Sequence, residues 1–342
     1  MKIIRDSLWG DIEVSDLALA IIDTPHFQRL HYIRQTGFSY KVFPGANTSR
    51  FEHSLGVYEV TRNLLTLLVT KQPELRETLD ERTQEIVCIA GLIHDLGHGP
   101  FSHLFDHYVS QELEPSPWTD HETRSLLLLR DLVRRYAVPL SEQELDTIER
   151  LVLGTHPPAW YATLINNQES GLDTDKIDYV LRDARSFGMK TIFDPSRLLR
   201  HNTRVIDDRL CFCDRVRDEI ITLFLVRNKM NRFIYRHPRV LRFEHEFLAL
   251  LRRSSGSAEV LRILRDGDMD GFLALSDASL LATVRGDDWW AIECRRGGTE
   301  ERPPAILYRD TAWENIRNLW FYRKKEPGAC FRIEDWNHVS PF

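Results

Sequence analysis

A dense group of histidines and aspartates lies shortly after residue 90 of this 342-residue chain. Its members, all able to bind a metal or move a proton, are His94, Asp95, His98, His103, Asp106 and His107. The chain has 13 histidines in all, so chance would not place so many here. Burying these groups would cost on the order of several kcal/mol unless a metal or partner charges compensated them. A lone His-Asp pair is usually only a hydrogen-bonded helix end, but this group predicts a chemical site.

The adjacent pair His94-Asp95 can bind one ion only if its helix ends there. Neighbouring residues on a regular helix point about 100° apart. Gly97, Gly99 and Pro100 follow the pair and favour such an ending. Mixed imidazole and carboxylate ligands suit first-row metals and leave positions for water and phosphate oxygens. The sequence therefore predicts a divalent metal ion, Mn, Fe, Ni, Zn or Mg, without choosing among them.

A second polar pattern begins near residue 173. Helical spacing places Asp175, Tyr179 and Asp183 on one stripe, with Lys176 beside it. Alone, this pattern is most often a solvated helix with internal ion pairs. Together with the first group, it also fits contacts with a metal, a phosphate and a sugar.

Helices must position these side chains, because the first two thirds of the chain show mainly helical periodicity between short loops. Residues 83–96 are apolar on nearly every face, which predicts a central buried helix that ends at the His-Asp pair. Capping-box patterns at 119–122 and 141–144 predict two helix starts, and the first places His121 in the first turn.

The pattern is weaker after about residue 200. A strand is predicted at 209–214, helices at 217–235 and 239–251, and a Ser-Ser-Gly-Ser loop at 254–257. Residues 284–342 hold five of the eight tryptophans and suggest a small, partly β lobe.

We therefore predict a mainly α fold with two parts. The first is a catalytic domain over residues 1–250, and the second is a C-terminal accessory lobe over residues 251–342. With 42% hydrophobic residues, the chain can bury one large core or two modest ones.

The composition also restricts the partners. A net charge of -6 makes nucleic acid an unfavoured main ligand, since counterion release rewards excess Lys and Arg. No apolar stretch reaches the roughly 18 residues of a membrane span, and Asp6 interrupts the start of the chain before any signal-like region. Five cysteines without zinc-ligand spacing fit a reducing cytoplasm.

Three segments together resemble the signatures of one enzyme family. They are Arg-Phe-Glu-His-Ser-Leu-Gly at 50–56, Ala-Gly-Leu-Ile-His-Asp-Leu-Gly-His-Gly-Pro-Phe-Ser-His at 90–103 and Asp-Thr-Asp-Lys-Ile-Asp-Tyr at 173–179. The resemblance is to the HD-domain deoxynucleoside triphosphate triphosphohydrolases, found in animals with a sterile-alpha-motif domain and in bacterial relatives. It extends over residues 2–245 and includes 22–30 and 42–46. It implies an HD-domain helical bundle that converts a dNTP to deoxynucleoside and triphosphate by attack at the α-phosphorus.

Carried over residue by residue, the resemblance implies three groups of site residues. The metal ligands would be His53, His94, Asp95 and Asp175. The acid/base group would be His103, Asp106 and His121, with His98 lining the phosphate site. The substrate contacts would be Arg50, Lys176 and Arg227 on the triphosphate, and Gln35, Tyr179, Asp183 and Tyr235 on the sugar.

The chain departs from the animal enzymes at three places. Asn231 and Arg236 stand where those enzymes have a base-side His and Gln, and Gly37-Phe38-Ser39 replaces a glycine run near the sugar. At the regulatory nucleotide site, the matching residues are Asp23 and Gln28, and the differing ones are Arg5 and His31. The resemblance thus implies dNTP substrates and, by analogy, a homo-oligomer, and it leaves a regulatory nucleotide open.

Two other functions stay open. One is an HD phosphodiesterase, nucleotidase or nuclease that acts on cyclic nucleotides, nucleoside monophosphates or strand ends. The other is a non-catalytic nucleotide sensor. Arg50, Lys176 and Arg227 favour a triphosphate over a monophosphate. The complete set of ligands and acid/base residues ranks the sensor last.

Overall fold

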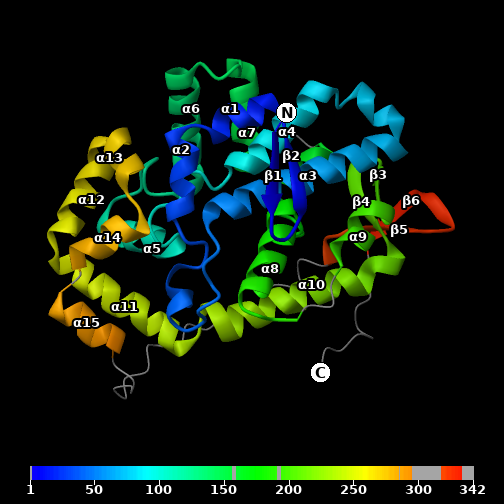
Figure 1. Cartoon of the computed structure of the whole chain (residues 1–342). Helices are drawn as coiled ribbons and strands as arrows, with labels where there is room; N and C mark the ends of the chain where they lie inside the picture. The colour runs from blue at the N-terminus through cyan, green and yellow to red at the C-terminus, as the bar shows by residue number, and fades with distance from the viewer. Residues whose placement is uncertain (1, 156–158, 191–193, 285, 295–316, 333–342) are drawn as a thin grey trace.

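The structure is a computed structural model that describes residues 2–155, 159–190, 194–284, 286–294 and 317–332. Helices dominate it, as the sequence predicts, and a small sheet lies on one side (Figure 1). Among the described residues, no helix combines the length and the apolar character that crossing a membrane requires.

Two helices, α3 (Arg50–Lys71) and α4 (Glu81–Ile93), form the centre of the fold. A capping box starts α3, because the Ser49 hydroxyl accepts from the Glu52 amide and the Glu52 carboxylate accepts from the Ser49 amide. The all-round apolar pattern of 83–96 is confirmed, since α4 is buried from Ile86 to Ile93. The end of α4 therefore delivers its polar residues into the interior.

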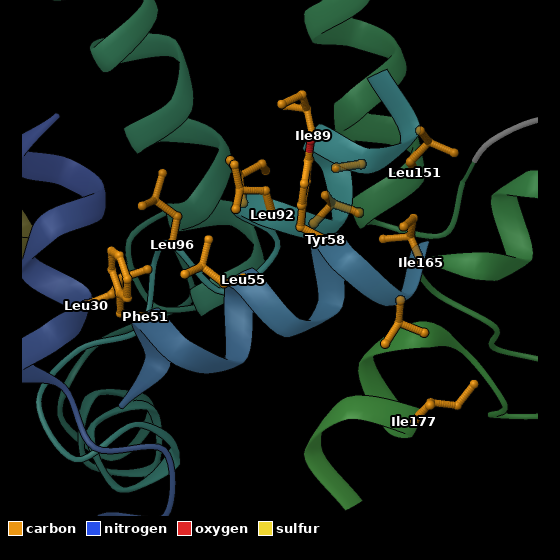
Figure 2. Packing of buried hydrophobic residues seen from close by; sticks show 14 of the residues in the cluster. Leu30, Phe51, Leu55, Tyr58, Ile89, Leu92, Leu96, Leu151, Ile165 and Ile177 are labelled. Carbon is orange, nitrogen blue, oxygen red and sulfur yellow. The ribbon is translucent and has the colours of Figure 1, made fainter. Parts of the chain in front are cut away.

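The core packs between these helices and their neighbours. Leu55 and Tyr58 of α3 point toward Ile89 and Leu92 of α4 (Figure 2). Each of these side chains is at most 2% exposed, and each buried aliphatic or aromatic side chain stabilises the fold by about 1.5–3 kcal/mol. The packing holds the ends of α3 and α4 in fixed positions.

The remaining helices of the first part surround this centre. They are α1 (Asp16–Ile22), α2 (Pro25–Gln28), α5 (His103–Glu112), α6 (His121–Tyr136), α7 (Glu142–Val152), α8 (Thr174–Ser186) and α9 (Pro195–His201). Short 3-10 segments connect them, including η2 (Gly37–Lys41). A hairpin of β1 (Lys2–Asp6) and β2 (Gly10–Val14) precedes α1.

The second half continues with helices along one side of the molecule. They are α10 (Arg217–Met230), the π-helical η6 (Asn231–Tyr235), α11 (Pro238–Arg253), α12 (Ser255–Asp266), α13 (Met269–Ala274), α14 (Asp277–Val284) and α15 (Asp287–Cys294). In Figure 1, α12, α13 and α14 gather at one end of the molecule and the sheet lies at the other. The predicted helices at 217–235 and 239–251 are confirmed, with a π-helical last turn in the first.

The sheet joins two distant parts of the chain. Its order is β3 (Thr203–Ile206), β4 (Arg209–Cys213), β5 (Trp320–Arg323) and β6 (Glu326–Arg332), with β4 and β5 parallel. The partly β character of the C-terminal region is thus confirmed, but its strands extend a hairpin that begins at residue 203. Of the five tryptophans in this region, Trp313 and Trp336 lie outside the described residues.

Two local predictions are wrong. Residues 254–257 do not form a loop, because α12 begins at Ser255, directly after α11. Ser and Gly are common at helix starts, and Gly256 allows close packing: a Cβ there would lie 2.4 Å from the Thr283 hydroxyl oxygen. The start of α6 is capped by Asp120, which accepts from the Thr123 amide, and not by the predicted box at Thr119.

One hydrophobic cluster extends from Ile12 to Phe321 and includes residues on both sides of position 250. The division into 1–250 and 251–342 therefore stays a prediction.

Candidate active site

Four side chains converge beside the end of α4. His53 comes from the first turns of α3, His94 and Asp95 follow α4, and Asp175 lies in the first turn of α8. The Nε2 atom of His53 lies 3.0 Å from an Asp175 oxygen and 3.3 Å from an Asp95 oxygen. The Nε2 atom of His94 lies 3.4 Å and 3.6 Å from oxygens of the same two carboxylates. The structure thus brings together all four predicted metal ligands.

The two imidazoles are oriented as metal ligands would be. The Nδ1 atom of His53 lies 2.8 Å from Asp178 Oδ2, and Nδ1 of His94 lies 2.8 Å from the carbonyl oxygen of Gly91. These acceptors take the Nδ1 protons and direct each Nε2 toward the carboxylates. Both Nε2 atoms are buried and have no hydrogen-bond partner among the described residues. Two imidazole nitrogens and two carboxylates directed at one point fit a divalent metal ion, which would replace any proton held on Nε2.

The charges at this point oppose the effect of burial. Burial would raise the pKa of Asp175, but its contacts with His53 and His94 lower that pKa below its ordinary value. Burial would also lower the pKa of His53, but its carboxylate contacts raise that pKa well above its ordinary value. The carboxylates are therefore ionised at neutral pH, as metal binding requires.

Asp178 supports the ligands from behind, and sequence reasoning missed it. Besides His53, its carboxylate accepts from the Trp9 indole at 2.5 Å and from Arg182 Nε at 2.8 Å. Arg182 in turn donates to Asp6 at 2.8 Å. The signal was present, because Asp178 stands one helical turn after Asp175. Gly56 provides the room, since a Cβ there would lie 1.9 Å from the Asp178 carboxylate.

We expect Asp178→Asn to weaken metal affinity by roughly 10- to 100-fold, because partners of this kind orient the ligand and raise its basicity. Metal titration of the folded protein measures the effect. Asp270→Asn is the control, because Asp270 is exposed and pairs with Arg135 on the surface. Unchanged affinity in Asp178→Asn would show that Asp178 has only a structural role.

A second cluster lies next to the first. Its members are His98, His103, Asp106 and His121, and one donor atom from each lies within 4.8 Å of the others. The rings of His98 and His121 stack with centroids 4.1 Å apart. Asp106 Oδ2 lies 2.9 Å from His121 Nδ1 and 3.6 Å from His98 Nδ1.

Two buried arginines give this cluster a different character from the first. Arg124 binds the other Asp106 oxygen and also donates to the Gly97 carbonyl oxygen at 2.8 Å. Arg50 binds Asp95 between the two clusters. The charge of Arg124 on Asp106 makes this cluster less suited to a metal ion.

The two candidate acids differ in pKa. Burial and the charge of Arg50 lower the pKa of His103 to about 4. Burial also acts on His121, but the hydrogen bond with Asp106 outweighs it and raises the pKa of His121 above its ordinary value. At neutral pH, His121 can therefore hold a proton that His103 cannot. The sequence did not distinguish the roles of these two residues, and their surroundings favour His121 as the acid.

Arg50 is positioned by a turn that the C-terminal helices hold. Its Nε donates to Ser102 Oγ at 2.9 Å, and that hydroxyl donates to the Arg34 carbonyl oxygen at 2.7 Å. Phe101 and Ser102 have φ of 61° and 57°, a left-handed conformation that costs non-glycine residues energy. Asp277 of α14 holds the turn, because it accepts from the Phe101 amide at 2.7 Å and the Arg34 amide at 3.0 Å.

We expect Asp277→Ala to lower kcat by about 10²-fold with little change in metal content, because small misplacements of catalytic groups have effects of this size. Asp277→Asn keeps one acceptor oxygen for the Phe101 amide and should retain part of the activity. Steady-state kinetics with metal analysis checks this, and full activity of Asp277→Ala would contradict the positioning role.

Both clusters border a cavity of about 1010 Å³. Six of the predicted substrate residues line it: Gln35, Arg50, Tyr179, Asp183, Arg227 and Tyr235. Lys176 does not, and its ammonium group lies 3.9 Å from Asp173 instead. His53 and His98 are fully buried behind the cavity wall.

The middle of the cavity offers polar groups suited to a sugar. Tyr235 donates to Asp183 Oδ2 at 2.6 Å, and Arg227 donates to the Tyr179 hydroxyl at 2.8 Å. Asp183 Oδ1 and Gln35 Oε1 have no hydrogen-bond partner within the described part of the chain. Burial raises the pKa of Asp183 to about 6. These unpaired oxygens can accept hydrogen bonds from ligand hydroxyl groups.

Comparisons with known proteins agree with this geometry. Residues 50–184 match the HD domain family. The chain is 38% identical over 240 residues to the deoxynucleoside triphosphate triphosphohydrolase SAMHD1 homolog of Dictyostelium discoideum, covering 69% of this chain and 46% of that protein. It is 36% identical over 266 residues to human deoxynucleoside triphosphate triphosphohydrolase SAMHD1, covering 69% and 42%.

A viral protein matches over a longer stretch. The chain is 32% identical over 302 residues to the HD domain-containing protein L394 of Acanthamoeba polyphaga mimivirus, covering 83% of this chain and 64% of that protein. The chain spans less than half the length of the SAMHD1 relatives described above. The family match includes both clusters, from Arg50 to Asp183. Residues 50–184 of the chain are therefore an HD domain.

Proposed function

We propose that this protein is a metal-dependent dNTP triphosphohydrolase that releases deoxynucleoside and intact triphosphate. The observation that carries the proposal is the adjacency of two different clusters on one cavity. One cluster directs two imidazole nitrogens toward two carboxylates, and the other presents a histidine whose pKa is raised above its ordinary value. The cavity of about 1010 Å³ has room for a nucleoside triphosphate. The SAMHD1 relatives, named as deoxynucleoside triphosphate triphosphohydrolases, support the same reaction.

His53, His94, Asp95 and Asp175 would hold the metal ion, which supplies Lewis acidity and an activated water next to the α-phosphorus. Arg50, which is fixed by Ser102 and Asp95, would neutralise charge that develops on the phosphate oxygens. His121 would donate its proton to the 5′-oxygen as that oxygen leaves, and Asp106 would keep the proton on the ring until then.

The sugar and the rest of the triphosphate would meet different walls of the cavity. Asp183 and Gln35 would accept from the sugar hydroxyl, and Tyr235 would lie on the 2′ side, where it would exclude a ribose hydroxyl. Arg227, which donates to the Tyr179 hydroxyl, would bind the outer phosphates, and Tyr179 would pack against the sugar. Lys176, which does not line the cavity, would act through its charge.

The test is product analysis by anion exchange after incubation of the metal-loaded protein with each dNTP and NTP. We expect deoxynucleoside plus triphosphate from dNTPs only. Stepwise loss of single phosphates, or turnover only of cyclic nucleotides, monophosphates or strand ends, would favour the phosphodiesterase, nucleotidase or nuclease. Binding without any turnover would favour the nucleotide sensor.

Several predictions from the sequence accompany this proposal without a test of their own. They are a cytoplasmic location, a homo-oligomeric state and a regulatory nucleotide. Two positions at the regulatory site are engaged within the chain, because the His31 ring stacks on Phe51 with centroids 3.6 Å apart and Arg5 pairs with Asp11 at 2.8 Å.

A further inference from the structure

One acidic residue of the cavity has no role in the proposed reaction. Glu244 lies in the middle of α11 and lines the cavity together with Leu241 and Leu248, one turn before and after it. No hydrogen bond or ion pair reaches its carboxyl group from the described residues, and burial raises its pKa to about 7. By contrast, Glu246 on the same helix binds Arg242 at 2.8 Å.

In the proposed complex, Glu244 would lie near the nucleobase. A nucleotide lies in the order phosphate, sugar, base, so the base extends beyond the sugar residues and away from the metal ligands. Gln35 contacts the sugar in the proposed complex, and Gly37 follows it two residues later. A Cβ on Gly37 would lie 3.6 Å from Glu244 Oε1 and 3.3 Å from the Phe101 carbonyl oxygen. Glu244 therefore lines the cavity beside the segment that would contact the sugar.

We propose that Glu244 selects guanine among the bases, an inference that rests on the proposed triphosphohydrolase function. The pKa of the Glu244 carboxyl is about 7, and a base with two donors would hold this carboxyl in the ionised form, which only accepts hydrogen bonds. Guanine presents two adjacent donors, the ring N1–H and the exocyclic amino group, which match the two oxygens of one carboxylate. Adenine and cytosine present an amino group beside an acceptor nitrogen, and thymine presents one N–H between two carbonyl oxygens. These three bases would set an acceptor against the carboxylate.

The partial burial of Glu244 makes this readout effective. A partly buried carboxylate without partners is unfavourable, so a ligand that supplies two donors recovers the missing hydrogen bonds. A base that supplies one donor and one acceptor leaves one Glu244 oxygen without a hydrogen bond. It also places the negative partial charge of its acceptor atom against that oxygen. Bidentate readout of this kind discriminates by roughly 10- to 100-fold.

The experiment compares kcat/KM for the four dNTPs in mixed-substrate assays. We expect the wild-type protein to prefer dGTP by roughly 10- to 100-fold. Glu244→Gln has one acceptor and one donor, which match adenine and cytosine, so the preference should move from dGTP to dATP and dCTP. Glu244→Ala should remove most of the preference. Glu246→Gln, the same change on the same helix outside the cavity lining, should keep the wild-type preference.

Equal kcat/KM for all four dNTPs in the wild type, or an unchanged preference in Glu244→Gln, would overturn the role of Glu244 and leave the proposed reaction intact. If no dNTP releases triphosphate, the proposed function fails by itself. In that case, equilibrium binding of dGTP and dATP to the wild type and to Glu244→Gln decides the base question independently of turnover. Equal affinities for the two nucleotides would then overturn it.

Discussion

His94→Ala should remove the bound metal and turnover together. The His94 imidazole presents its Nε2 atom to Asp95 and Asp175, and no other described side chain is placed to replace it. Loss of a residue that merely supports a ligand typically costs about 10- to 100-fold, so loss of the ligand itself should lower turnover by at least roughly 10³-fold. Metal analysis of the purified protein and an assay of triphosphate release measure both effects.

The matched control is His201→Ala, because His201 is exposed at the end of α9 and belongs to neither cluster. It should keep metal and activity. If His94→Ala retained full turnover with its metal, the assignment of the metal site would be wrong.

His121→Ala should separate proton transfer from metal binding. The metal ligands do not include His121, so metal content should stay at the wild-type level. Turnover should fall by roughly 10²- to 10⁴-fold, the range for a lost general acid or base. His103→Ala should have a smaller effect, because burial and Arg50 hold the pKa of His103 at about 4 and keep it neutral. The opposite order of the two variants would transfer the acid role to His103.

The pH dependence follows from the same assignment. A proton donor is active in its protonated form, so kcat should fall as pH rises through the pKa of His121. Asp106 raises that pKa against the effect of burial. In Asp106→Asn the raising interaction is lost and burial remains, so the decline should move to lower pH. A pH profile of kcat for both proteins shows whether the decline moves. A decline at the same pH would show that Asp106 does not raise the pKa of the proton donor.

The sequence predicted the parts of the site that local patterns carry. The His94-Asp95 pair after an apolar helix and the stripe from Asp175 to Asp183 follow from the helical period, and both lie where the pattern places them. The convergence of His53 with these residues depends on how α3, α4 and α8 pack. No local pattern encodes that packing, so the resemblance to a family had to supply it.

What could not be predicted is the set of contacts between distant segments. Asp277 of α14 accepts a hydrogen bond from the Phe101 amide, and Trp9, between β1 and β2, donates one to Asp178 of α8. Such partners have no fixed spacing in the sequence. The separation of His103 from His121 also needed the structure, because their pKa values depend on Asp106 and Arg50 in space. Glu244 was missed because an acidic residue on an amphipathic helix is ordinarily solvated.

In the proposed reaction, a water molecule attacks the α-phosphorus at the metal-binding cluster. Hydrolysis of a dNTP in ¹⁸O-labelled water, with mass analysis of the products, measures this attack directly. We expect one ¹⁸O atom in the released triphosphate and none in the deoxynucleoside, with the label lost in His94→Ala because turnover is lost. Label in inorganic phosphate or in the deoxynucleoside would contradict it.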